Sequence, residues 1–177
     1  AKTLGKIAPR RAYYPGALDR HAAFCAAYPA ADLLGSAEGL NLPWALATGL
    51  DPDDENPLAF QQEAWCGVLA ETALPGSDAD EFLPRAVEFC NQRLFGTLSC
   101  TLIIDPKSAA SHSSSLEQAL EDLRYGAIAV NHWTGVAYGV GSIPWGAHPG
   151  HSPGRIGSGM GFVHNTDLLE GVTKSIL

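Results

Sequence analysis

Apolar residues follow a helical period near the start of the chain and then give way to loop signals. Between residues 18 and 28 they recur at offsets of three and four, which predicts a helix that ends before Pro29. Glycine, proline and an acidic run at 51–55 interrupt residues 35–57, which predicts a loop with a short strand at 44–48. We therefore expect residues 1–60 to form an irregular and helical N-terminal segment.

The middle of the chain alternates between strand and helix patterns. Apolar and β-branched runs predict buried strands, and capped amphipathic runs predict helices. At the start of the helix predicted at 114–125, SSLE at residues 114–117 matches a capping box. The order of the elements is a strand at 68–74, a helix at 80–94, a strand at 98–105 that places Ile103 in the core, a helix at 114–125 and a strand at 127–130. Residues 61–131 are thus expected to form a β-α-β-α-β core, an α/β fold whose mainly parallel sheet is flanked by helices.

Glycine dominates the last part of the chain, residues 132–177. Glycines are so frequent between residues 131 and 161 that regular helix is not expected there, although the accompanying aromatic residues favour an ordered loop. A final strand is predicted at 162–165 and an extended tail at 173–177.

Composition and charge exclude several classes of protein. The 177 residues fit one domain, and the 11 lysines and arginines are scattered in a chain of net charge −8, so nucleic acid is not an expected partner. No apolar stretch of about 20 residues is present, so we expect no membrane association and a cytoplasmic protein. The four cysteines form no C-x-x-C pair, and we expect them to be reduced and buried.

Residue chemistry alone gives few candidate sites. GSGMG at residues 157–161 has the spacing of neither a nucleophile elbow nor a dinucleotide-binding loop. His148 and His151 are separated by proline and glycine, which do not present paired zinc ligands, so no metal site is expected. Glu63 lies beside Trp65 just before a predicted strand, and this carboxylate is either a ligand contact or a solvated group where the strand begins.

Three short words occur along the chain in a recognisable order. QEAWCGV at residues 62–68 resembles the E-E-x-F-G-P-V motif of the aldehyde dehydrogenase superfamily. PWGAHPG at residues 144–150 stands where that family has P-F-G-G-x-K-x-S-G, and GMG at 159–161 follows as its second glycine group. The strand ending in Val130 and Asn131 also matches a Val-Asn ending in the family. The chain therefore resembles a single partial catalytic domain, the C-terminal part in a divergent branch, because Cys66-Gly67 replaces Gly-Pro and Trp65 replaces Phe.

This resemblance implies an oxidoreductase that converts an aldehyde to a carboxylic acid with NAD or NADP. It implies two cofactor contacts, because Glu63 stands where the family's glutamate binds the nicotinamide ribose hydroxyls and Trp65 where an aromatic residue packs on the nicotinamide. No catalytic residue is assigned, since no cysteine here has the family's G-Q-x-C context. We therefore expect this chain alone to be inactive and to bind neither cofactor tightly.

The resemblance also implies a less specific role for four further residues. Asn131, Pro144, Trp145 and Gly146 correspond to segments that form the floor of the active site and the tunnel for a small aldehyde in a complete enzyme. Turn geometry is an equally good explanation of these residues.

Two interpretations of the whole chain stay open at this point. The first is a portion of the oxidoreductase, and the alternative is a non-catalytic binding or assembly module that retains the fold. In either case self-association is expected, because a domain separated from its neighbours exposes apolar surface. The tail at 173–177 either adds a strand across such an interface or frays.

Overall fold

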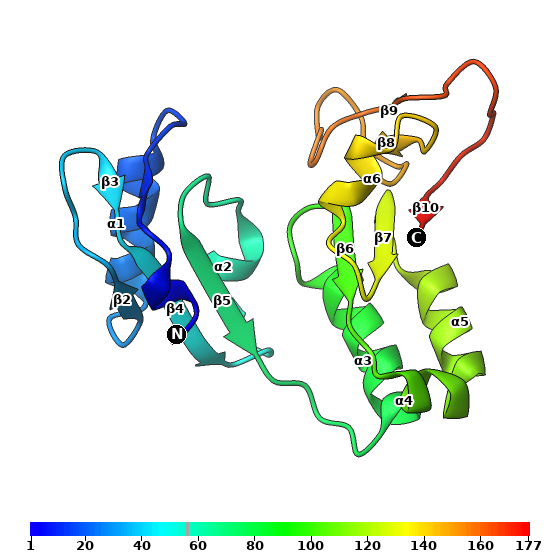
Figure 1. The fold of residues 1–177 in the computed structure, drawn as a ribbon, viewed down its shortest axis with the longest axis horizontal. Coiled ribbons are helices and arrows are strands. Elements are labelled where there is room, and N and C mark those ends of the chain that lie inside the picture. The colour runs from blue at the N-terminus through cyan, green and yellow to red at the C-terminus, as the bar shows by residue number, and fades with distance from the viewer. Residues whose placement is uncertain (56) are drawn as a thin grey trace. The chain divides into compact units, whose positions relative to one another are not determined.

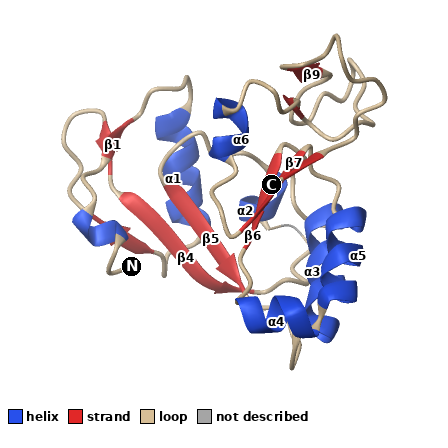
Figure 2. Cartoon of the chain, turned by 45° about the vertical axis from the view of Figure 1, so that its right-hand side comes forward, coloured by secondary structure: helices blue, strands red, loops and turns tan. Residues whose placement is uncertain are grey.

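In the computed structural model, which describes residues 1–55 and 57–177, the chain divides into two units, Ala1–Leu74 and Pro75–Leu177. Both units combine helices and sheets, which confirms the α/β class in its general form (Figures 1 and 2). None of the described helices is both long and apolar enough to cross a membrane.

The first unit is built on a mixed three-stranded sheet with the order β2-β4-β5. Strand β4 runs antiparallel to β2 and parallel to β5, with Ala45 opposite Val68. Phe24 of α1 packs on Ala45 and Ala47 of β4, because residues 17, 21 and 24 share one buried helical face. A second, two-stranded sheet pairs β1 with β3. The elements are η1 (Leu4–Lys6), β1 (Arg10–Arg11), α1 (Ala17–Ala27), β2 (Asp32–Leu34), β3 (Asn41–Leu42), β4 (Trp44–Leu50), α2 (Leu58–Gln61) and β5 (Val68–Thr72).

The second unit contains a wholly parallel sheet with the order β10-β7-β6. The central strand β7 buries Ile128 completely, and Leu123 and Tyr125 complete the core next to it. Helices α3 and α5 lie side by side next to this sheet (Figure 1). The elements are α3 (Ala79–Gln92), β6 (Ser99–Leu102), α4 (Pro106–Ser111), α5 (Ser113–Asp122), β7 (Ala127–Val130), α6 (Gly135–Gly139), β8 (Trp145–Gly146), β9 (Phe162–Val163) and β10 (Ser175–Ile176).

The sheet partition differs from the sequence prediction. The strands predicted at 68–74, 98–105 and 127–130 do not share one sheet, because β5 pairs with β4 in the first unit whereas β6 and β7 pair in the second. The short strand predicted at 44–48 is confirmed as β4, which continues to Leu50 and has three consecutive buried residues. It provides β5 with a parallel neighbour from an earlier part of the chain. The expected core at 61–131 therefore spans the boundary between the two units.

The predicted core position of Ile103 is wrong. Ile103 is 83 % exposed. Strand β6 ends at Leu102, and beyond it the backbone of Ile104 pairs with the side chain of Asn131. The Asn131 amide donates to the Ile104 carbonyl oxygen and accepts from the Ile104 N–H, both at 2.9 Å. The backbone is thus held on both sides of Ile103 while its side chain faces outward.

The capping box predicted at Ser114 is not formed. Asp105 instead caps the additional helix α4, accepting hydrogen bonds from the N–H groups of Lys107 and Ser108, and Pro106 occupies the first helical position. Helix α5 then begins at Ser113, so Ser114 already lies inside it. The Asp-Pro pair was the stronger local start signal.

The C-terminal tail forms a strand of this chain's own sheet. Strand β10 pairs in parallel with β7, and the Leu177 N–H donates to the Ile128 carbonyl oxygen at 2.9 Å. Lys174 ties the tail to the end of α5, since its ammonium donates to the carbonyl oxygens of Leu120, Glu121 and Leu123. The glycine-rich region before it also contains α6, a short helix that was not expected.

Candidate functional site

Glu63 and Trp65, the two cofactor contacts suggested by the sequence, line the same cavity in the first unit. The cavity has a volume of about 790 Å³ and lies at the start of β5. Its lining comprises Ile7, Arg10, Arg11, Ala12, Tyr13, Tyr14, Leu42, Trp44, Glu63, Ala64, Trp65, Cys66, Gly67 and Val68. Residues 7–14 of the N-terminal segment and residues 63–68 of the QEAWCGV motif thus line the same cavity.

Aromatic rings form much of the cavity lining. The rings of Tyr14 and Trp65 lie 4.6 Å apart between centroids with a tilt of 60°, and Tyr13 contacts Tyr14 edge to face at 5.1 Å. Trp65 has a positive φ of 56°, which is uncommon for a bulky residue and turns the backbone just before β5. Tyr13 is 84 % exposed and Trp65 is 42 % exposed, so an exposed aromatic surface borders the cavity. Such surfaces are typical of binding sites.

Trp44 holds the floor of the cavity against the backbone of β5. Its indole N–H donates to the Ile7 carbonyl oxygen at 3.0 Å, and its ring lies over Gly67. A Cβ atom at position 67 would approach the Trp44 ring to 2.8 Å, so glycine is required for this packing.

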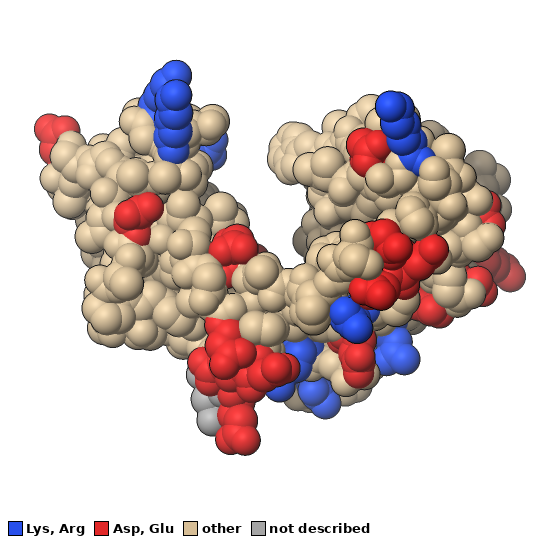
Figure 3. Space-filling model, turned by 90° about the horizontal axis from the view of Figure 1, so that it is seen from below, with Lys and Arg blue, Asp and Glu red and all other residues tan. Residues whose placement is uncertain are grey.

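The charges at the cavity are two guanidinium groups and one carboxylate. Arg10 and Arg11 form β1, which is held in register by pairing with Leu42 and Asn41 of β3. Glu63 supplies the carboxylate. On the face drawn in Figure 3, basic side chains stand in small groups between acidic and neutral ones. The sequence analysis missed Arg10, Arg11, Tyr13 and Tyr14, although the word RRAYY at residues 10–14 concentrates two charges and two aromatic rings.

The other residues suggested by the sequence lie in the second unit. Asn131 adopts a positive φ of 59° and uses its amide to extend the pairing between β6 and β7, as described above. Its observed contacts are therefore those of a structural residue at the end of a strand. The resemblance had grouped Asn131 with Pro144, Trp145 and Gly146, and the structure assigns all four to the same unit.

The segment from Pro144 to Gly146 packs against the later glycine-rich loop. Trp145 and Gly146 form β8 and pair with β9, and the Trp145 ring contacts the Tyr138 ring edge to face at 5.7 Å. The Pro144 carbonyl oxygen accepts a hydrogen bond from the Ser175 hydroxyl at 2.8 Å. Pro144 also borders a cavity of about 230 Å³ that is lined mainly by residues 162–172.

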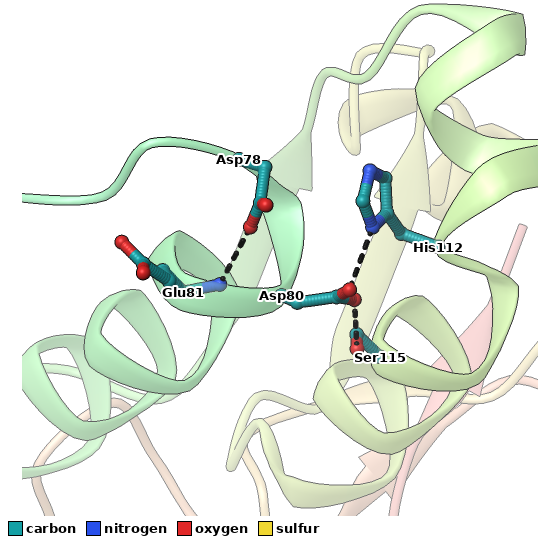
Figure 4. A network of polar contacts seen from close by, with 5 residues as sticks. All are labelled: Asp78, Asp80, Glu81, His112 and Ser115. Atoms are coloured by element: carbon teal, nitrogen blue, oxygen red, sulfur yellow. Dashed lines mark hydrogen bonds and ion pairs between the residues drawn. The ribbon is translucent and has the colours of Figure 1, made fainter.

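A polar network joins α3 to α5 in the second unit (Figure 4). The Asp80 carboxylate lies 2.9 Å from Nδ1 of His112 and accepts a hydrogen bond of 2.5 Å from the Ser115 hydroxyl. Ser115 and His112 together lower the pKa of Asp80. Because the Ser115 hydroxyl donates to Asp80, it is not aligned as a nucleophile activated by His112. The sequence gave no signal for these contacts, which join residues more than 30 positions apart.

The Asp78 carboxylate in the same view caps α3. It accepts a hydrogen bond from the Glu81 N–H at 3.1 Å. The Glu81 carboxylate in turn accepts a hydrogen bond from the Ser77 N–H at 3.1 Å. This reciprocal arrangement satisfies two backbone donors at the helix start. The helix predicted at 80–94 therefore begins at Ala79 with Asp78 as its cap.

All four cysteines are free and half-buried, whereas the sequence led us to expect reduced and buried cysteines. Burial raises the pKa of the Cys25 and Cys90 thiols, and it raises that of Cys100 to about 11. In the cavity of the first unit, burial raises the pKa of Cys66 more than the nearby Arg20 guanidinium lowers it. The thiolate is the reactive form, so these environments do not activate a nucleophile at neutral pH.

Among the described residues, no group of three or more His, Cys, Asp or Glu side chains is arranged to hold a metal ion. No family model matches the chain, and no curated protein is significantly similar to it. The candidate site is thus defined by its own geometry, with Glu63 and Trp65 among its lining residues.

Proposed function

We propose that this chain is a portion of an aldehyde-dehydrogenase-like oxidoreductase, which converts an aldehyde to a carboxylic acid with NAD or NADP. The observation that carries the proposal is the shared cavity of Glu63 and Trp65, at the position where the E-E-x-F-G-P-V resemblance requires a carboxylate and an aromatic ring. The parallel strand β5 follows directly, as the resemblance also requires.

The residues around the cavity fit a nicotinamide nucleotide in kind. The exposed Glu63 carboxylate is a strong acceptor for the two ribose hydroxyls, and the half-exposed indole of Trp65 offers a surface for a planar ring. When bound, the cofactor supplies the acceptor for the hydride. Glu63 and Trp65 orient the ribose and the ring, and they hold no proton or nucleophile of the reaction.

The segments around Asn131 and Pro144 are proposed to shape the aldehyde site by their backbone. The Asn131 amide forms hydrogen bonds with Ile104, and the Pro144 carbonyl oxygen accepts one from Ser175. These polar groups therefore hold the loops in place, and we assign them no contact with the substrate. Capture of the aldehyde by a thiolate is not assigned to this chain, because burial raises the pKa of each of its thiols. We therefore expect no aldehyde-dependent reduction of NAD or NADP by these 177 residues.

The test of this function is binding of nicotinamide riboside, followed by NMR signals of the Trp65 indole and the amides of residues 63–65. Weak binding is expected, and Glu63→Gln is expected to weaken it by about threefold to tenfold, since an amide binds ribose hydroxyls less strongly than a carboxylate. Glu38→Gln is the matched control, because it removes an exposed carboxylate of the same unit outside the cavity. Equal affinities of the two variants would contradict the proposed role of Glu63.

One observation favours the second candidate, an assembly module without chemistry. A largely apolar cavity of about 510 Å³ lies between α3 and the end of β6, and the exposed side chains of Phe82 and Ile103 border it. Because β6 is an edge strand, we propose that a second copy of the chain covers this surface. Sedimentation at micromolar concentration tests this self-association. Ile103→Lys is expected to shift the protein towards monomer, and a wild-type chain that is already monomeric would contradict it.

A further inference from the structure

A small cavity of about 210 Å³ lies in the glycine-rich region of the second unit. Its lining contains three side chains with atoms that bind transition metals, namely His148, His151 and Met160. The other lining residues, whose side chains offer no ligand atom, are Ala147, Pro149, Gly150, Gly159, Gly161 and Phe162. The function proposed above gives the two imidazoles and the thioether no role.

Thr97, just before β6, holds both histidines and the segment that carries Met160. The His148 N–H donates to the Thr97 carbonyl oxygen at 3.0 Å, and Nε2 of His151 forms a hydrogen bond of 2.7 Å with the Thr97 hydroxyl. The Thr97 N–H donates at 2.8 Å to the hydroxyl oxygen of Ser158, which precedes Met160 by two positions. The loop therefore brings residues 148, 151 and 158 together at one residue, although proline and glycine separate the two histidines.

A hydrogen bond at one nitrogen of each imidazole leaves the other nitrogen for a ligand. Nδ1 of His148 donates to the Pro149 carbonyl oxygen at 3.0 Å, so its Nε2 keeps a lone pair. In His151 the Thr97 hydroxyl contacts Nε2, and among the described residues Nδ1 forms no hydrogen bond. A Cβ atom at Gly157 would lie 2.7 Å from this Nδ1, so glycine leaves that side of the ring open. Histidines that bind metals commonly have such a bond at the second nitrogen, which fixes the orientation of the ring.

The ligand set fits a soft cation better than a hard one. Calcium and magnesium prefer oxygen ligands, whereas this cavity offers two imidazoles and a thioether without a carboxylate. A thioether is a soft ligand that favours Cu(I), and Met160 has a flexible side chain that is 54 % exposed. We infer that His148, His151 and Met160 form a Cu(I) site. This inference goes beyond the proposed oxidoreductase function and does not rest on it.

The methionine provides a specific probe of the site, because Met160 is the only methionine of the chain and its methyl group gives a single NMR signal. The protein is titrated with Cu(I) under anaerobic, reducing conditions, and bicinchoninate sets the free Cu(I) concentration. Binding to the four cysteine thiols then does not change the occupancy of this site. We expect the Met160 methyl signal and the ring signals of His148 and His151 to shift together with one midpoint. Zn²⁺, which prefers nitrogen, thiolate and carboxylate ligands, should leave the methyl signal in place.

Three substitutions identify the ligands. Met160→Leu removes the thioether from an exposed side chain, and the midpoint followed at the histidine rings should rise by about tenfold or more. His148→Gln and His151→Gln should raise the midpoint followed at the Met160 methyl group to a similar extent. The matched control is His132→Gln, which removes an exposed histidine of the same unit outside the cavity and should leave the midpoint unchanged.

His151→Gln also removes the contact with Thr97, so the amide NMR spectrum of each variant is compared with that of the wild type. If this variant does not fold, Met160→Leu and His148→Gln decide the result. A methyl signal that Cu(I) does not shift, or an unchanged midpoint in Met160→Leu, would overturn the site. An equal shift of the methyl signal by Zn²⁺ would overturn the choice of Cu(I).

Discussion

Large apolar side chains have different surroundings in the parallel sheet of the second unit and in the cavity of the first unit. In the second unit such residues surround Ile128 of the parallel sheet, where the side chain is fully buried. In the first unit Tyr13, Tyr14 and Trp65 remain exposed around a cavity that also holds charged groups. The buried side chains of the parallel sheet contribute to stability, whereas the exposed aromatic rings bury less surface and are those for which we propose a binding role.

The largest expected effect compares two isoleucines of the second unit. Ile128→Ala should lower the free energy of unfolding by ~2–5 kcal/mol, because it removes buried methyl groups from the central strand. Ile103→Ala should change it by less than about 0.5 kcal/mol, because the Ile103 side chain is exposed. Denaturant unfolding measures both values. Similar losses in the two variants would contradict the described position of β6 and β7.

A pair of glycines tests how closely the loop after Pro144 approaches the sheet. A Cβ atom at Gly126 would come within 1.8 Å of the Gly146 carbonyl oxygen, so Gly126→Ala should cost ~1–3 kcal/mol by forcing the backbone apart. At Gly139 a Cβ atom meets nothing within 4 Å, and Gly139→Ala should be neutral or slightly stabilising. Thermal unfolding of the two variants gives the difference. A stable Gly126→Ala protein would show that β8 does not lie against this position.

The smallest effect is the acid dependence of the contact between α3 and α5. The Ser115 hydroxyl and His112 lower the pKa of Asp80, so the charged carboxylate stabilises the folded state above the ordinary pKa of 3.8, and this contribution is lost as the pH falls through the lowered value. Asp80→Asn should therefore unfold at lower denaturant at neutral pH and match the wild type at the acid end. Ser115→Ala should act in the same direction to a smaller extent. A loss that is constant with pH would contradict the network.

Local signals in the sequence were sufficient for several elements. Helix α1, helix α3 and strand β7 were predicted from periodicity and capping, which depend on residues within a few positions. The division into sheets was not predictable in this way, because Val68 lies opposite Ala45, a residue from a segment interrupted by glycine and proline. The exposure of Ile103 was also hidden, since it depends on the Asn131 side chain from a distant strand end.

The candidate site was predicted in part for the same reason. Glu63 and Trp65 lie within one word, so the sequence alone placed them together. Arg10 and Arg11 reach the cavity only through the pairing of β1 with β3, which brings residues about 30 positions apart into register. Tyr14 joins the site through its ring contact with Trp65. Such long-range contacts have no local pattern from which they can be predicted.

The central claim is that these residues belong to an aldehyde-dehydrogenase-like oxidoreductase. Sequencing the transcript upstream of the codon for Ala1 tests this claim most directly, because the resemblance places the cofactor domain and the nucleophilic cysteine before the QEAWCGV word. The account predicts an in-frame coding sequence that contains a dinucleotide-binding segment followed by a G-Q-x-C word. An in-frame stop codon followed by a start codon next to Ala1 would contradict it and would favour the assembly module.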